Sequence, residues 1–231
     1  MISKTQRLKF FIENFLRNFF PNFLLELRIM RLRSKYLPRE FIKHVESLDN
    51  KSLVIDVGAN IGIVSAYIAK TGADVISFEP NKHAYQELKK IAKRYPNIKT
   101  HESAAGVSNR KVNLFLHKNY DDKYSDYSES SSLNVDKLNV SANKFQKIFE
   151  IDFAIFLKKL PKKVSLIKID IEGYEIELLN HLLDENALKN VDKIYLETHE
   201  NKFDNLVHPT NLLKQRIKNE GLSYKFFYEW H

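Results

Sequence analysis

The chain has 231 residues, of which 43% are hydrophobic and 12% aromatic, and its formal net charge is +8. These values describe a globular protein that can bury a substantial core, and they exclude an intrinsically disordered chain. Cysteine is absent, which excludes disulfides, thiolate metal sites and a thiol nucleophile. No apolar run approaches the roughly 20 residues of a membrane-spanning helix, and the charged N-terminus does not resemble a signal peptide, so we expect a cytoplasmic protein.

The positive charge is concentrated at the N-terminus. Residues 1–43 contain ten Lys or Arg and three Glu, a balance of +7, which leaves the rest of the chain near neutrality. A nucleic-acid enzyme should instead carry a basic groove on its catalytic domain, so we expect no nucleic-acid partner. We expect residues 1–48 to form a basic helical appendage to a domain over residues 49–231.

The appendage is predicted to form two amphipathic helices that are broken at Phe20-Pro21. Asn22 is a suitable N-cap for the second helix. An apolar stripe follows along that helix: Phe23, Leu24, Leu27 and Met30. The segment can dock on the catalytic domain or form a homodimer interface, or it can lie on the inner face of an anionic membrane as a peripheral helix. Both interpretations remain open.

Residues 53–62 contain the most informative local pattern of the chain. Residues 53–57 are apolar and β-branched, as in a strand buried on both faces, and a turn with Gly58, Asn60 and Gly62 follows. A strand that enters a helix through such a turn gathers backbone N–H groups and the positive end of a helix dipole at one point. Asp56 ends the strand, where a bound cofactor or the turn itself can donate hydrogen bonds to its carboxylate. The segment therefore predicts a site for a nucleotide-type cofactor.

Several known glycine-containing motifs could account for this segment. A phosphate-binding P-loop requires Gly-Lys-Ser/Thr, but Ile63 follows Gly62, so that interpretation fails. The NAD fingerprint requires glycines at its first, third and sixth positions, which hold Gly58, Asn60 and Ile63, so an NAD-dependent oxidoreductase is the weaker alternative. The pattern Asp-x-Gly-x-Asn-x-Gly resembles the first motif of class I S-adenosylmethionine-dependent methyltransferases. Glu79 ends the next predicted strand and is placed to accept both hydroxyls of a ribose; an ordinary strand-to-helix turn is the remaining alternative.

The middle of the chain alternates predicted strands and helices. Ser103 and Ala104 follow the third strand, and their small side chains would let an adenine ring lie flat, although a tight turn explains them equally well. Residues 119–132 lack apolar periodicity and are predicted to be a loop whose tyrosines and hydroxyls suit a polar acceptor. Asp152 is expected to cap the helix that follows it. The other elements are expected at 82–94 and 153–160 (helices) and at 98–102, 112–117 and 145–151 (strands).

A second motif narrows the family. The run KIDIEGYE, residues 168–175, joins a predicted buried strand through a glycine turn to a helix, and a later strand carries Glu197 and His199 at its carboxyl end. With the two motifs described above, these segments resemble the FkbM family of methyltransferases over about residues 50–200. The resemblance implies a Rossmann-like fold, S-adenosylmethionine as the methyl donor and O-methylation, usually of a sugar or polyketide-type hydroxyl. It does not identify the acceptor; if the acceptor is a lipid-linked glycan, docking of the N-terminal segment and its contact with a membrane can both hold.

Carboxylates and one histidine are expected at the carboxyl edge of the sheet, where open α/β sheets bind ligands. Methyl transfer needs an aligned hydroxyl and a base for its proton, and a pKa near neutrality favours His199, so we expect catalytic roles for His199, Asp170 and Glu197. Alternatively, Asp170, Glu172 and Glu197 offer the oxygen ligands of Mg²⁺, which would lower the pKa of the acceptor hydroxyl. Lys168 would orient Asp170 or the acceptor, with an exposed lysine on an edge strand as the alternative. In the structural alternative, the acids only complement a helix dipole.

The alternation of strands and helices predicts the fold class. It is α/β, a doubly wound, mostly parallel sheet of Rossmann-like class I methyltransferase type with an N-terminal helical appendage. The last helix is expected at 208–219 and the last strand at 223–228. The final antiparallel strand usual in that class has no evident counterpart, which leaves one sheet edge undefined. We expect S-adenosylmethionine-dependent O-methylation of a sugar, glycan or related small-molecule hydroxyl, with a non-catalytic Rossmann-like binding or scaffold module as the alternative.

Overall fold

A computed structural model describes residues 15–17, 19–118, 131–133, 140–200 and 204–230. Its centre is a six-stranded sheet with the order β3-β2-β1-β7-β8-β9, in which every pair of neighbours is parallel. The strands are β1 Leu53–Val57, β2 Asp74–Phe78, β3 Ile98–His101, β7 Val164–Ile169, β8 Val191–Glu197 and β9 Phe226–Trp230. Most of the first predicted helix, and the predicted loop up to residue 130, lie outside the described residues.

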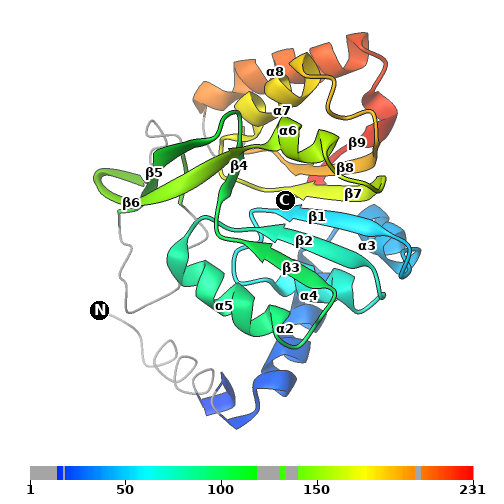
Figure 1. Ribbon diagram of the computed structural model, residues 1–231, viewed down its shortest axis with the longest axis vertical. Coiled ribbons are helices and arrows are strands. Elements are labelled where there is room, and N and C mark those ends of the chain that lie inside the picture. The colour runs from blue at the N-terminus through cyan, green and yellow to red at the C-terminus, as the bar shows by residue number, and fades with distance from the viewer. Residues whose placement is uncertain (1–14, 18, 119–130, 134–139, 201–203, 231) are drawn as a thin grey trace.

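Helices cover both faces of this sheet (Figure 1). One face is covered by α2 Pro21–Lys35, α3 Arg39–Glu46, α4 Ile63–Ala69 and α5 Lys82–Ala92, and the other by α6 Phe153–Lys158, α7 Glu175–Asp184 and α8 Asp204–Asn219. The strand order runs outward in opposite directions from β1 and β7, so these two central strands form the topological switch point where doubly wound sheets bind ligands. The predicted fold class is confirmed.

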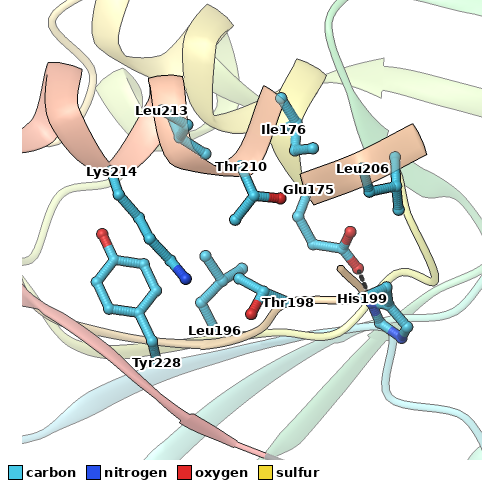
Figure 2. A pocket seen from close by; sticks show the side chains of 10 residues that line it. All are labelled: Glu175, Ile176, Leu196, Thr198, His199, Leu206, Thr210, Leu213, Lys214 and Tyr228. Atoms are coloured by element: carbon cyan, nitrogen blue, oxygen red, sulfur yellow. Dashed lines mark ion pairs between the residues drawn. The ribbon is translucent and has the colours of Figure 1, made fainter. Parts of the chain in front are cut away.

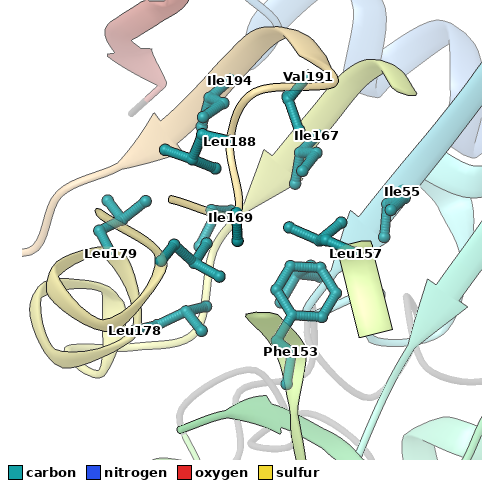
Figure 3. Close-up of a cluster of buried hydrophobic side chains, with 14 of the residues drawn as sticks. Ile55, Phe153, Leu157, Ile167, Ile169, Leu178, Leu179, Leu188, Val191 and Ile194 are labelled. Carbon is teal, nitrogen blue, oxygen red and sulfur yellow. The ribbon is translucent and has the colours of Figure 1, made fainter. Parts of the chain in front are cut away.

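The side chains of the central strands alternate between two cores. Ile55 and Val57 of β1 pack in a cluster with Phe153 and Leu178 from the helices of one face, whereas Val54 belongs to the cluster on the opposite face. Figure 3 shows the first cluster, in which side chains from β1, β7, β8, α6 and α7 meet. Burial on both faces explains why these strands are nearly continuous apolar runs.

A second sheet of three strands was not expected in full. It has the order β4-β6-β5 and consists of β4 Ala104–Gly106, β5 Arg110–His117 and β6 Val140–Asp152, with β5 and β6 antiparallel. The predicted strands at 112–117 and 145–151 are parts of β5 and β6, but β4 was missed because three small residues carry no strand pattern. The predicted cap is confirmed, since the Asp152 carboxylate accepts a hydrogen bond from the backbone N–H of Ile155 at 3.0 Å.

The start of the second N-terminal helix differs from the prediction. Helix α2 begins at Pro21 with Phe20 as its N-cap, and no side chain caps it, so the prediction of Asn22 as N-cap was wrong. Proline suits the first helical position because its missing N–H would have no intrahelical partner there.

The apolar stripe of α2 is divided between two faces. Leu24, Leu25 and Ile29 are buried, and the latter two join the core cluster that contains α4. Phe23 and Met30 lie on the outer face and are 56% and 65% exposed. The helix is therefore docked on the domain through one face, and it leaves a second apolar face in solvent. Within the described residues, no helix is both long enough and apolar enough to cross a bilayer.

The C-terminal elements were predicted with shifted bounds. Helix α8 begins at Asp204, before the predicted start at 208, because its buried face extends over Leu206, Thr210, Leu213 and Ile217. A short 3-10 turn occupies Ser223–Lys225, where a strand was predicted, and β9 follows it. Strand β9 pairs with β8 in parallel and forms the sheet edge that the sequence left undefined.

Candidate active site

The turn after β1 is held in left-handed backbone geometry. Gly58, Asn60 and Gly62 have φ values of 77°, 48° and 88°. Glycine adopts this region without strain, and asparagine tolerates it better than most residues, which explains the residue types of the motif. The backbone N–H groups of Gly58 and Ala59 both donate to the Phe78 carbonyl at 3.0 Å, so the turn is tied to the end of β2.

Glu79 lies beside this turn, at the carboxyl end of β2. Its carboxylate accepts hydrogen bonds from the backbone N–H of Asn60 at 2.8 Å and of Asn81 at 2.7 Å. Burial raises the pKa of Glu79 to about 7, against these two N–H groups and Lys168, which lower it. Each carboxylate oxygen has a second lone pair, so Glu79 can still accept the hydroxyls of a ribose, and the residues present fit a nucleoside cofactor here.

Asp56 lies below the turn and not in an open crevice. In register, Ser77, Asp56 and Lys168 are neighbours on β2, β1 and β7. The Ser65 hydroxyl, on α4, donates to the Asp56 carboxylate at 2.6 Å, and Asp56 has no exposed surface. Because side chains alternate along β1, Asp56 lies in the core, and in this structure it has no exposed surface for the direct contact with a cofactor that we expected.

Lys168 joins the two central strands at their carboxyl ends. Its ammonium group donates to the Gly58 carbonyl at 2.7 Å and lies 3.4 Å from the Asp56 carboxylate and 3.3 Å from that of Asp170. Burial alone would lower the pKa of Lys168, but Asp170 and Asp56 outweigh burial and raise it. The prediction that Lys168 orients Asp170 agrees with these contacts.

The turn after β1 and the segment after β7 are in direct contact. The backbone N–H of Asp170 donates to the Val57 carbonyl at 3.1 Å. A Cβ atom added to Gly58 would lie 1.8 Å from the Asp170 carbonyl oxygen, which is far inside van der Waals contact. Glycine is therefore required at position 58 for two reasons, its positive φ and the close contact with the Asp170 carbonyl. The same contact places the predicted cofactor turn next to the KIDIEGYE motif.

Four carboxylates surround His199, which lies two residues beyond the end of β8. Its Nδ1 atom is 3.1 Å from Glu175, and its Nε2 atom is 3.5 Å from Glu172, 3.7 Å from Glu197 and 3.9 Å from Asp170. Figure 2 shows Glu175 above the imidazole ring, at one end of a mainly apolar cavity between α7, β8, α8 and β9. The structure thus brings together His199, Asp170, Glu172 and Glu197, which the sequence had singled out.

Glu175 was missed as a site residue, although it lies in the KIDIEGYE motif. Its carboxylate oxygens accept the backbone N–H groups of Ile171 and Gly173, both at 2.9 Å, and so hold the turn in which Glu172 has a φ of 60°. An acidic residue in the first turn of a helix has an ordinary explanation in the helix dipole. No local signal shows that it also reaches His199 from another element.

His199 itself is withdrawn from solvent. Burial lowers its pKa, but pairing with Glu175 and the other carboxylates outweighs burial and raises it. The side chain has no exposed surface, whereas those of Asp170, Glu172 and Glu197 are 26%, 18% and 13% exposed. Within this cluster, solvent therefore reaches the carboxylates of Asp170, Glu172 and Glu197 but not the imidazole.

The expected adenine contacts are divided. Ser103 is buried just after β3. Ala104 packs into the core of the second sheet with Leu114 and Ile148, so its side chain contacts protein atoms where we expected an adenine ring. Ser131 and Ser132, two hydroxyl residues at the end of the loop that was predicted to suit a polar acceptor, also lie at the site. The Ser132 hydroxyl donates to the Glu172 carbonyl at 2.8 Å, and Ser131 accepts a hydrogen bond from the Asn81 side chain at 3.3 Å. The end of the predicted acceptor loop thus contacts both halves of the site.

A parallel doubly wound sheet, a left-handed turn beside an acidic strand end, and a carboxylate cluster at the switch point are features that fit a Rossmann-like methyltransferase. The comparisons with known proteins agree with this class. A family model described as the methyltransferase FkbM domain matches residues 56–221, which is more than half of the chain. The chain belongs to the FkbM family of methyltransferases, and S-adenosylmethionine is the donor that this membership implies. The NAD-dependent alternative is thereby set aside.

Two curated relatives are methyltransferases by name. Methyltransferase 1 of Beauveria bassiana is 23% identical over 174 residues, covering 69% of this chain and 70% of the relative. The hexuronic acid methyltransferase AglP of Haloferax volcanii is 26% identical over 155 residues, covering 67% of this chain and 59% of AglP. Among solved structures, a precorrin-6y C5,15-methyltransferase from Geobacter metallireducens matches with a TM-score of 0.41 and 12% identity, covering 79% of this chain and 73% of that chain.

Proposed function

We propose that this methyltransferase transfers the methyl group of S-adenosylmethionine to a hydroxyl group of a sugar, a glycan or a related small molecule. The observation that carries the proposal is the contact between Gly58 and Asp170, because it sets the turn that would hold the donor against the carboxylates that would face the acceptor. The name of AglP, a hexuronic acid methyltransferase, supports a sugar as the acceptor.

The residues divide the work between the two halves of the site. Glu79 accepts the ribose hydroxyls, and the turn at Gly58, Asn60 and Gly62 receives the rest of the donor. S-adenosylmethionine supplies a methyl carbon that its sulfonium has already activated. Asp170 and Glu197 would face the acceptor, and one of these two carboxylates would take up the single hydroxyl proton while the methyl group passes from the sulfur to the acceptor oxygen.

The binding part of the proposal is tested by calorimetry. We expect S-adenosylmethionine to bind and NAD not to bind. Glu79→Ala should weaken donor binding by about tenfold or more, because it removes a charged acceptor of hydrogen bonds. Glu87→Ala is the matched control, since Glu87 is paired with Lys90 on the outer part of α5. Unchanged affinity in Glu79→Ala would contradict the assignment of the cofactor site.

The acceptor is tested by transfer of a labelled methyl group. Uronic acid glycans, neutral glycans and nucleotide sugars are offered in parallel, with the reaction product mapped to a position by mass spectrometry. Label in an ether-linked methyl group of a sugar supports the proposal. Donor binding without transfer to any of these classes would favour the non-catalytic scaffold alternative or a different acceptor class.

The outer face of α2 supports a proposal about where the enzyme works. Phe23, Leu27 and Met30 are exposed along one stripe of the helix, and the exposed cations Arg31 and Lys35 lie beside it. We propose that this face binds an anionic membrane surface, because basic amphipathic helices bury phenylalanine and leucine there while their cations meet lipid phosphates. A symmetric dimer through the same face would instead bring the basic segments of both copies together.

Co-sedimentation with vesicles tests this location. We expect binding to phosphatidylglycerol vesicles, little binding to phosphatidylcholine vesicles, and loss of binding in a Phe23→Ser, Met30→Ser double variant. Leu212→Ser, at an exposed leucine of α8, is the control. If the double variant binds like the wild type, the membrane proposal is wrong; a dimer in light scattering that the double variant abolishes would assign the face to a second copy.

A further inference from the structure

Glu150 is a buried carboxylate that the proposed function does not use. It lies on β6, and its side chain has no exposed surface. Its oxygens accept hydrogen bonds from the backbone N–H of Val107 at 2.8 Å, the Arg110 guanidinium at 2.6 Å and the Tyr174 hydroxyl at 3.0 Å. Burial of a carboxylate is costly, and these donors offset the cost. Because the first two donors lie in or next to the second sheet and the third lies at the start of α7, Glu150 joins these two parts of the molecule.

Gly106, at the end of β4, leaves room for this carboxylate. A Cβ atom added to Gly106 would lie 1.9 Å from Glu150 Oε1, far inside van der Waals contact. The φ of Gly106 is not in the left-handed region, so the backbone conformation does not require glycine there. The space that Glu150 occupies is therefore the reason for glycine at this position.

Tyr174 is the partner of Glu150 on the other side of this contact. It is buried and is the N-cap residue of α7, and its hydroxyl lies 3.0 Å from Glu150 and 3.2 Å from Glu177. Burial raises the pKa of Tyr174, and the two carboxylates raise it further, so the hydroxyl keeps its proton at neutral pH. Hydrogen bonds from a neutral donor to an ionised acceptor are stronger than those between neutral groups. The bond between Tyr174 and Glu150 is thus a strong link between α7 and β6.

The segment that leads into α7 carries two of the carboxylates near His199. We call residues 170–173 the carboxylate turn, and in it Glu172 and Gly173 have φ values of 60° and 103°. A residue other than glycine keeps a positive φ only where the surrounding structure holds it. Glu175 accepts two backbone N–H groups of this turn, and the Ser132 hydroxyl donates to the Glu172 carbonyl. The geometry of the turn therefore depends on contacts with side chains outside it.

We propose that Glu150 and Tyr174 are positioning residues for methyl transfer. Their hydrogen bond fixes the end of the carboxylate turn to the second sheet, and it thereby sets the direction of the Asp170 carboxylate toward the acceptor hydroxyl. The effect on the rate rests on the proposed function, whereas the effect on the turn does not. Donor binding should not depend on this bond, because Glu79 and the turn after β1 lie on other elements.

Hydrogen–deuterium exchange tests the hold on the turn without donor, acceptor or activity. Tyr174→Phe removes only the hydroxyl, and we expect the amides of residues 171–175 to exchange about tenfold faster, because a hydrogen bond to a charged acceptor is lost. Tyr67→Phe is the matched control, since Tyr67 is also buried but lies on α4, at the opposite face of the central sheet. Exchange in the turn should not change in this control. Unchanged exchange in Tyr174→Phe overturns the proposal.

Transfer of a labelled methyl group to the acceptor found in the transfer assay measures the effect on the reaction. We expect kcat of Tyr174→Phe to fall about tenfold, with KM for S-adenosylmethionine within about twofold of the wild type. Glu150→Gln should retain more activity than Glu150→Ala, because its amide oxygen can still accept from Tyr174. Wild-type kcat in Tyr174→Phe, or equal losses in the two Glu150 variants, overturns the positioning role. Circular dichroism verifies folding, and Tyr174→Phe decides the matter if a Glu150 variant does not fold.

Failure of the proposed function gives a different result. In that case the wild type transfers no methyl group, and the exchange experiment alone decides whether Tyr174 and Glu150 hold the turn. Wild-type transfer that Tyr174→Phe leaves unchanged contradicts the positioning role and leaves the methyltransferase proposal standing.

Discussion

Replacing Gly58 by alanine should lower the stability of the protein, and the same replacement at a second glycine, Gly221, serves as the reference. Gly58 and Gly221 have similar φ values, 77° and 71°, but different surroundings. An added Cβ at Gly58 meets the Asp170 carbonyl oxygen at 1.8 Å, whereas at Gly221 it meets nothing within 4 Å. The pair therefore separates the cost of backbone conformation from the cost of the contact between the two motifs.

The magnitudes follow from these two terms. A left-handed alanine costs about 1–2 kcal/mol at either position. The contact at Gly58 is with backbone, which cannot rotate away, and forced repacking of this kind costs a further 1–3 kcal/mol or so. The reduced entropy of the unfolded chain acts equally in both variants and cancels in the comparison. We expect Gly58→Ala to be less stable than Gly221→Ala by about 1–3 kcal/mol.

Urea denaturation followed by far-UV circular dichroism measures both variants under the same conditions, provided that the m values agree. Calorimetric binding of S-adenosylmethionine is the second readout, and we expect a loss of affinity in Gly58→Ala and none in Gly221→Ala. The reasoning is refuted if the two variants are equally stable, or if Gly58→Ala binds the donor as tightly as the wild type does.

The remaining predictions concern single charged side chains. Burial raises the pKa of Glu79 from 4.5 to about 7, so between these pH values the folded protein keeps a proton that the unfolded chain has lost. The free energy of unfolding should therefore fall by about 3 kcal/mol as pH rises from 4.5 to 7. Glu79→Gln should remove this part of the pH dependence, measured by urea denaturation at each pH. Lys168→Met should lower the free energy of unfolding by about 3–5 kcal/mol, because Asp56 and Asp170 lose the buried cation that they share. A loss below about 1 kcal/mol would show that Lys168 is not energetically coupled to these two carboxylates. Asp152→Ala should cost about 1 kcal/mol by removing the cap of α6, and Asp152→Asn should cost less because its amide oxygen still accepts; equal losses would contradict the capping role.

Local patterns predicted the parts of the site that lie within one strand and its turn. Gly58, Asn60 and Gly62 were found because left-handed geometry restricts residue type, and Glu79 because a parallel sheet places consecutive strand ends side by side. The pairing of Glu175 with His199 could not be found in the same way, because α7 and β8 are adjacent only after the chain between them has folded.

The same limit applies to the edges of the fold. The face that α2 buries, with Leu25 and Ile29, depends on the position of α4, and both of its faces are apolar enough to be chosen. The three residues of β4 form a strand only because β6 pairs with them. In each case the deciding partner is distant in sequence, and the local pattern is too short or too symmetric to indicate it.

For this protein, the periodicity of apolar residues and the positions of its glycines were enough to determine the doubly wound sheet and the turn at its switch point, because burial and backbone sterics act over a few consecutive residues. Tertiary structure alone decided that Asp56 lies within the core and that four carboxylates meet at His199. The direction of a side chain at a strand end depends on the register between neighbouring strands, and the charge that it meets there comes from other elements.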